Sequence, residues 1–115
     1  MDLSAIVGQE LSAVEFVQDY LQLRFDGPTL ALFVWPEVFR EEGSYAYGEP
    51  EFRNVLCALI AENVTAATLE EDEALEIEFE SGVILRATLR SEEIAVPEAG
   101  HYLPTGQPAD GLFEF

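Results

Sequence analysis

The chain contains no lysine, and its five basic residues, all arginines, face 23 acidic residues. Nucleic-acid-binding proteins neutralise phosphates with Lys and Arg, and anionic membranes attract the same side chains. At a formal net charge of −18, this chain should be repelled by both surfaces. We therefore expect no nucleic acid and no membrane as partner, and any charged partner should be cationic.

Cysteine and long apolar runs are also scarce. The single cysteine, Cys57, cannot form an internal disulfide, which favours a reducing compartment. The longest apolar runs, residues 30–35 and 55–61, are much shorter than the roughly 20 residues of a transmembrane helix. Residues 1–4 lack the positive charge and apolar stretch of a signal peptide. These absences predict a cytoplasmic protein.

Motifs of common enzyme chemistry are missing. The chain has no glycine-rich phosphate loop, no Cys/His cluster with zinc spacing and no Gly-x-Ser-x-Gly motif. His101 is the only histidine, and with Glu98 three residues before it marks a candidate ligand pocket. The alternative is a histidine that packs under the tail, since a general base also needs a partner and a pocket. From the motifs and residue types present, we predict no catalytic residue, no bound metal and no cofactor.

Alternating apolar and polar residues predict β-hairpins in both halves of the chain. In the second half, a three-residue loop over 80–82 places Ile77 opposite Leu85 and Glu76 opposite Arg86. A two-residue loop would set Arg86 against Ile77 and bury a charge, so the pattern selects the longer loop.

The first hairpin follows the same logic. A loop over residues 26–29 would place Phe25 opposite Leu30 and Leu23 opposite Leu32. Its other face is also apolar and needs a cover, either the helix, the tail or a second subunit; this face consists of Tyr20, Phe33 and Trp35.

The chain contains a weak internal sequence similarity, in which residues 6–14 align with residues 59–67. The simplest account is two copies of a three-stranded meander, over residues 6–35 and 64–90. Chance similarity between amphipathic hairpins is the alternative.

A helix is predicted over residues 50–61 by Pro50 and a stripe at helical spacing, made of Phe52, Val55, Leu56, Leu59 and Ile60. Cys57 should be buried in this helix, and a reactive thiol would need electropositive surroundings that the chain hardly offers. A dyad of Cys57 with His101 has no spacing rule in its favour. Residues 91–115 are predicted to wrap the surface and to end in a last strand.

These elements predict one α+β domain over residues 1–115. Its core would be a curved, mainly antiparallel sheet of six or seven strands with one helix packed on a face.

The densest acidic run, Glu70, Glu71, Asp72 and Glu73, adjoins the predicted strand that carries Glu76 and Glu78. A cationic protein should dock on these six residues. Tyr45 and Tyr47 are candidate anchors, because tyrosine is favoured in interfaces. Three alternatives remain: the acidity serves solubility alone, the tyrosine loop only packs on the sheet, or the run is a solvated turn. The run lacks the spacing of a calcium loop.

The order of elements resembles a group of small bacterial domains in which paired hairpins follow a Leu-x-Gly start and end in Phe-x-x-Gly-x-x-Leu. The matching stretches here are Ile6-Val7-Gly8, residues 21–27 and residues 75–85, with a closing segment at 91–99. Some of these domains resemble immunity proteins, which neutralise a toxin by binding it. The resemblance implies a non-catalytic binding module. A small-molecule-binding protein or small enzyme with a pocket near His101, and a structural homodimer, are the other hypotheses.

Overall fold

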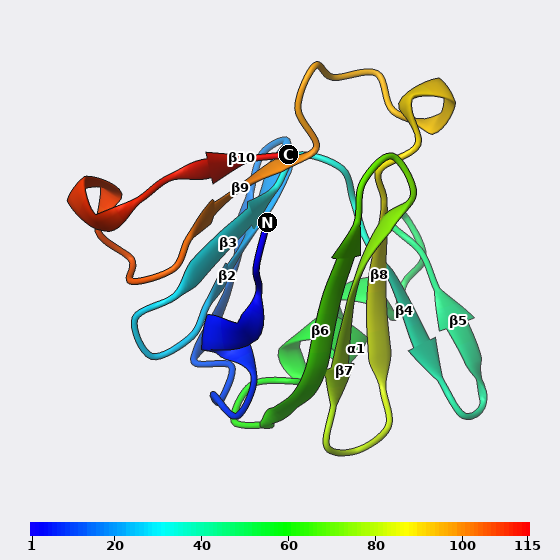
Figure 1. Ribbon diagram of the computed structural model, residues 1–115. Helices are drawn as coiled ribbons and strands as arrows, with labels where there is room; N and C mark the ends of the chain where they lie inside the picture. Colours follow the sequence, from blue (N-terminus) through cyan, green and yellow to red (C-terminus); the bar gives the residue numbers. More distant parts are fainter.

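The computed structural model describes residues 1–115 and contains two antiparallel sheets of five strands each, which lie against each other as two layers (Figure 1). The first sheet has the order β1 (Ala13–Val17), β2 (Tyr20–Arg24), β3 (Thr29–Leu32), β9 (Gly100–Leu103) and β10 (Phe113–Glu114). The second has the order β5 (Gly43–Tyr45), β4 (Glu37–Arg40), β8 (Ile84–Thr88), β7 (Ala74–Phe79) and β6 (Val64–Glu70). Short 3₁₀ turns are η1 (Ser4–Ile6), η2 (Ser91–Glu93) and η3 (Pro108–Asp110).

The α+β class is confirmed, but the single sheet of six or seven strands is wrong. Three consecutive strands, β1–β3, begin the first sheet, and β6–β8 end the second. The remaining strands come from residues predicted as connector or tail: β4 and β5 extend the second sheet, whereas β9 and β10 extend the first. The predicted last strand of the tail is present as β10.

The register of the second hairpin agrees with the prediction. Ile77 pairs with Leu85 and Glu76 pairs with Arg86. The Gly82 N–H donates to the Phe79 carbonyl and Gly82 has a φ of 91°, as a three-residue loop requires. Cross-strand charge pairing and the burial of alternate residues are therefore sufficient to fix this register.

The register predicted for the first hairpin is wrong by two residues. Leu23 pairs with Leu30 and Leu21 with Leu32, so that the loop is the dipeptide Asp26-Gly27. Asp-Gly favours a tight two-residue turn, because Gly27 adopts a φ of 100° without steric cost. A shift by two residues leaves every side chain on the same face, and the leucines remain in the core.

One core of 23 buried residues joins both sheets and the helix. Most of the large, fully buried side chains are leucines, which lie on the inner strand faces or, like Leu11, Leu56 and Leu59, outside the strands; the others include Ile6, Phe52, Phe79 and Tyr102. The alternation that predicted each strand therefore also supplies the contact between the two layers.

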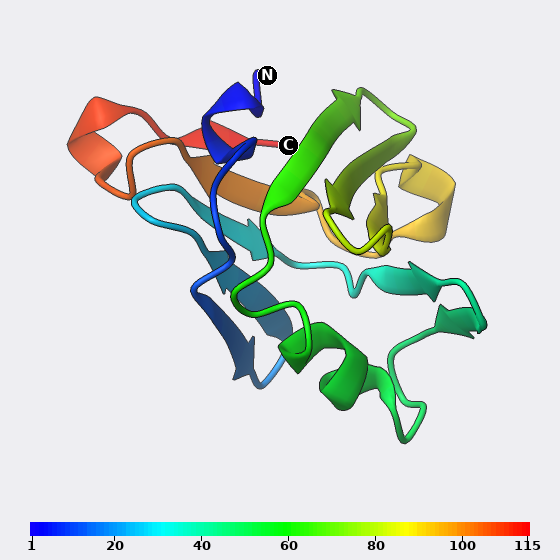
Figure 2. The same cartoon turned by 90° about the horizontal axis from the view of Figure 1, so that it is seen from below.

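The only α-helix, α1 (Phe52–Cys57), is shorter than the predicted 50–61. It ends early because the Ala61 N–H donates to the Leu11 carbonyl, and Ala61 itself has a φ of 77°. The helix does not pack on a sheet face: it contacts β1 and β4 and lies at the side where the two sheets part (Figure 2). Cys57 and Ile60 are consequently exposed, against the prediction. None of the helices is long and apolar enough to span a membrane.

Tyr102 on β9 is fully buried, and its hydroxyl has no hydrogen-bond partner. We expect Tyr102→Phe to raise the free energy of unfolding by about 1 kcal/mol, because the folded protein no longer desolvates an unpaired hydroxyl. Burial also raises the pKa of Tyr102 above the ordinary value of 10.0. The folded state then binds the phenolic proton more tightly than the unfolded state, so wild-type stability should fall as pH rises above 10.

Urea denaturation at neutral pH and above pH 10 measures both effects. Tyr102→Phe should show a weaker alkaline decline than the wild type, whereas the control Tyr20→Phe, at a half-buried tyrosine, should retain the full decline. A clear loss of stability in Tyr102→Phe at neutral pH would show that the hydroxyl is hydrogen-bonded.

Candidate functional site

The acidic turn of residues 70–73 joins β6 to β7 at one end of the second sheet (Figure 1). All four side chains are exposed. Glu73 lies 3.7 Å from the Arg90 guanidinium, but Glu70, Glu71 and Asp72 have no basic group within ion-pair distance. Three carboxylates of this turn are therefore free to attract a cation.

An apolar hollow of about 260 Å³, which we call the turn recess, lies beside this turn. Glu71 and Asp72 line it on the acidic side. Its apolar lining comes from four separate segments of the chain and consists of Leu69, Leu89, Ile94, Val96, Pro97, Ala99 and Phe115. Sequence analysis found the acidic residues and missed the recess, since only the folding of the tail against the second sheet brings these segments together.

Glu76 and Glu78 lie on the outer face of the second sheet, in different environments. Glu76 forms an ion pair with Arg86, its cross-strand neighbour, so its charge is largely offset. Glu78 is exposed, and it accepts a hydrogen bond of 3.3 Å from the Thr65 hydroxyl. Of the two predicted strand residues, only Glu78 presents an uncompensated charge.

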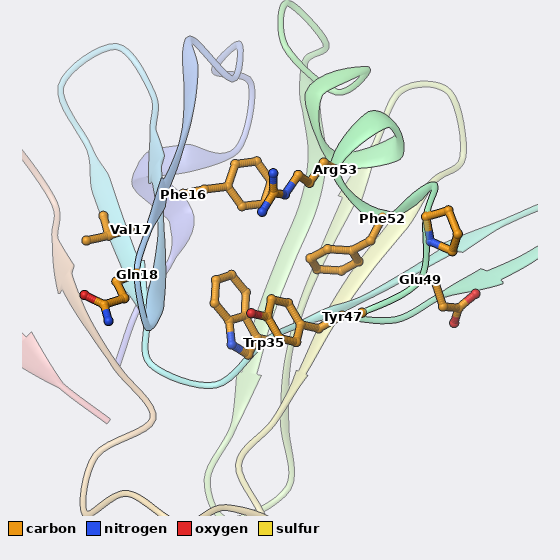
Figure 3. Close-up of a pocket in the computed structure, with 10 residues that line it drawn as sticks. Phe16, Val17, Gln18, Trp35, Tyr47, Glu49, Phe52 and Arg53 are labelled. Atoms are coloured by element: carbon orange, nitrogen blue, oxygen red, sulfur yellow. The ribbon is translucent and has the colours of Figure 1, made fainter.

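The second hollow is an aromatic groove of about 500 Å³ beside α1 (Figure 3). Tyr47 stacks on Trp35 with ring centroids 4.2 Å apart and planes 11° from parallel. Phe52 meets both rings edge-on, and the Arg53 guanidinium lies 5.8 Å from the centroid of Phe16. Tyr47 covers one face of the indole while 56% of its own surface is exposed.

The two predicted tyrosine anchors do not form one site with the acidic turn. Tyr45 packs against the core, and its hydroxyl donates to the Glu42 carboxylate at 3.4 Å. Tyr47 lines the aromatic groove and not the turn recess. The predicted apolar back face is divided in the same way, because Trp35 belongs to the groove, whereas Tyr20 and Phe33 pack edge-to-face 5.7 Å apart on the first sheet.

The third hollow, about 320 Å³, lies on the outer face of the first sheet and includes Tyr20, Phe33, His101 and Leu112. At its edge, His101 Nε2 lies 2.8 Å from Glu98 Oε2, so the predicted pair is in contact. Glu114 on β10 is the register partner of His101 on β9 and joins them. One ligand atom from each of the three side chains lies within 4.8 Å of the others.

The contacts within this cluster shift the pKa values of two carboxyl groups. The hydrogen bond with His101 lowers the pKa of Glu98. The Glu98 carboxylate raises the pKa of Glu114, because protonated Glu114 can donate a hydrogen bond to it. Sequence analysis missed Glu114: the short spacing of Glu98 and His101 was visible, but the pairing of β10 with β9 was not. Cys57 is not in the cluster, so the dyad with His101 does not form.

Comparison with protein-family models, curated proteins and solved structures finds no match to this chain. The function must therefore be inferred from the geometry of the three hollows.

Trp35 is the only tryptophan, so the fluorescence of the chain reports on the surroundings of this one indole, which lines the aromatic groove. We expect Tyr47→Ala to move the emission of Trp35 to longer wavelength, because the stacked indole face becomes accessible to water. The loss of the aromatic pair should also cost about 1 kcal/mol of unfolding free energy. Tyr20→Ala is the control, since Tyr20 lies in a different hollow and should leave the emission unchanged. Unaltered emission in Tyr47→Ala would contradict the stacked arrangement.

Proposed function

We propose that this protein is a non-catalytic binding module that takes up a basic segment of another protein at the turn recess. The observation that carries the proposal is the apolar recess beside three uncompensated carboxylates, Glu70, Glu71 and Asp72. Apolar anchors seated in pockets supply most of the affinity in protein interfaces. Complementary charge at the rim sets orientation and speeds association.

The apolar recess and its acidic rim together indicate the chemistry of the partner. A segment that alternates apolar and basic residues would seat an apolar side chain in the recess and place Lys or Arg near Glu71 and Asp72. The net charge of −18 would draw such a segment from a distance at low ionic strength. An immunity-type role, in which the cationic partner is a toxin and the setting is cytoplasmic, is the version of this function that we favour.

We further propose that the meanders β1–β3 and β6–β8 descend from one repeated unit. Each occupies three adjacent positions in its own sheet, and each lies at a sheet end. Only the second meander carries the acidic turn, so binding would be a property of one copy.

Two fluorescent peptides of equal length and charge test the function, one alternating lysine with leucine and the other lysine with serine. We expect tighter binding of the lysine–leucine peptide in fluorescence anisotropy, because only leucine fills the recess. Glu71→Lys should weaken its binding about tenfold, through loss of one attraction and gain of one repulsion.

Glu10→Lys is the matched control, since it changes the net charge equally at an exposed position outside all described hollows. It should reduce the binding of both peptides slightly and equally. Equal affinity of the wild type for both peptides, or an equal loss in both variants, would show that the acidity acts as a diffuse charge without a docking site.

A further inference from the structure

The cluster on the outer face of the first sheet has the composition of a metal site. Glu98, His101 and Glu114 offer two carboxylate oxygens and one imidazole nitrogen, all within 4.8 Å of one another. No arginine forms an ion pair with either carboxylate, so His101 is the only group beside them that can carry positive charge. Two carboxylates are thus held together without a permanent counter-charge.

Secondary structure holds two of the three donors on a common face. His101 and Glu114 are directly paired on antiparallel strands β9 and β10, which places their side chains side by side. The Phe33 ring packs edge-to-face against the imidazole with centroids 4.9 Å apart and limits its rotation. Glu98 reaches the same point from the segment that leads into β9. The imidazole is therefore positioned before any ligand arrives.

We propose that Glu98, His101 and Glu114 bind a divalent transition-metal ion such as Zn²⁺. Two carboxylates and a neutral imidazole would balance the charge of the ion. Imidazole with carboxylates suits zinc and its neighbours, whereas Ca²⁺ and Mg²⁺ prefer oxygen ligands alone.

The donor atoms must adjust only slightly around the ion. Bonds of about 2.1 Å to zinc place tetrahedral ligand atoms about 3.4 Å apart. The Glu98–His101 pair, at 2.8 Å, would open a little, and the exposed Glu114 side chain would rotate inward. Three protein ligands leave a coordination position open, and His101 also lines the hollow formed with Tyr20 and Phe33. Water or a small anionic ligand would complete the coordination there.

The single histidine makes this site directly observable. In the full chain labelled with ¹⁵N, we expect one equivalent of Zn²⁺ at neutral pH to shift the imidazole Nε2 resonance of His101 strongly. Calorimetric titration with ZnCl₂ should give one site per chain, and excess CaCl₂ should not displace the zinc. An unchanged His101 resonance at one equivalent of Zn²⁺ would overturn the proposal.

Two ligand variants and one control separate this site from the general acidity. Glu114→Gln and Glu98→Gln, located in different segments, should each weaken Zn²⁺ binding about tenfold or more. Glu78→Gln removes the same charge from an exposed strand position without a histidine nearby and should leave the affinity nearly unchanged. Equal losses in all three variants would show diffuse attraction and refute the site. Glu71→Lys should leave zinc binding intact, so this test and the peptide test can fail independently.

Discussion

The pairing of β9 with β3 decides where the end of the chain lies, and both candidate sites depend on it. Gly100 begins β9 and is buried against the Ala31 carbonyl and the Phe115 ring, where a Cβ atom would clash with both. Because only glycine fits, the tail can pair with β3 and receive β10 on its other edge. That arrangement brings Glu114 to His101 and directs Phe115 into the lining of the turn recess.

Local patterns predicted the parts of the fold in which neighbours in sequence decide the structure. The second hairpin was predictable because only one register buries Ile77 and Leu85 while pairing Glu76 with Arg86. The first hairpin offered no charged pair to fix its register, and the Asp26-Gly27 turn shifted it. The division into two sheets could not be predicted from the sequence. β4, β5 and β9 show little alternation of apolar and polar residues and gain their partner strands only in the tertiary structure.

The candidate sites, too, were predictable only where their residues are close together in the sequence. Glu98 and His101 are close in sequence and were predicted together, whereas Glu114 entered only through strand pairing. The acidic turn was predicted from four consecutive residues, but the recess beside it draws on segments scattered over the second half of the chain. Tyr47 is exposed, as a candidate anchor must be, yet it stacks on Trp35, which the sequence pattern places on another face with Tyr20 and Phe33.

The two acidic features differ in how they hold their charge, and this difference is why we propose a different ligand for each. On the turn, Glu70, Glu71 and Asp72 are exposed and lack ion-pair partners, so they act as a solvated rim that suits the mobile basic side chains of a large partner. Glu98 and Glu114 are instead pressed together, closely enough for one carboxyl to raise the pKa of the other. Carboxylates at that separation cost free energy until a compact charge lies between them. A divalent ion would carry enough charge to offset both carboxylates at that point, whereas a single lysine or arginine head group offsets only one of them.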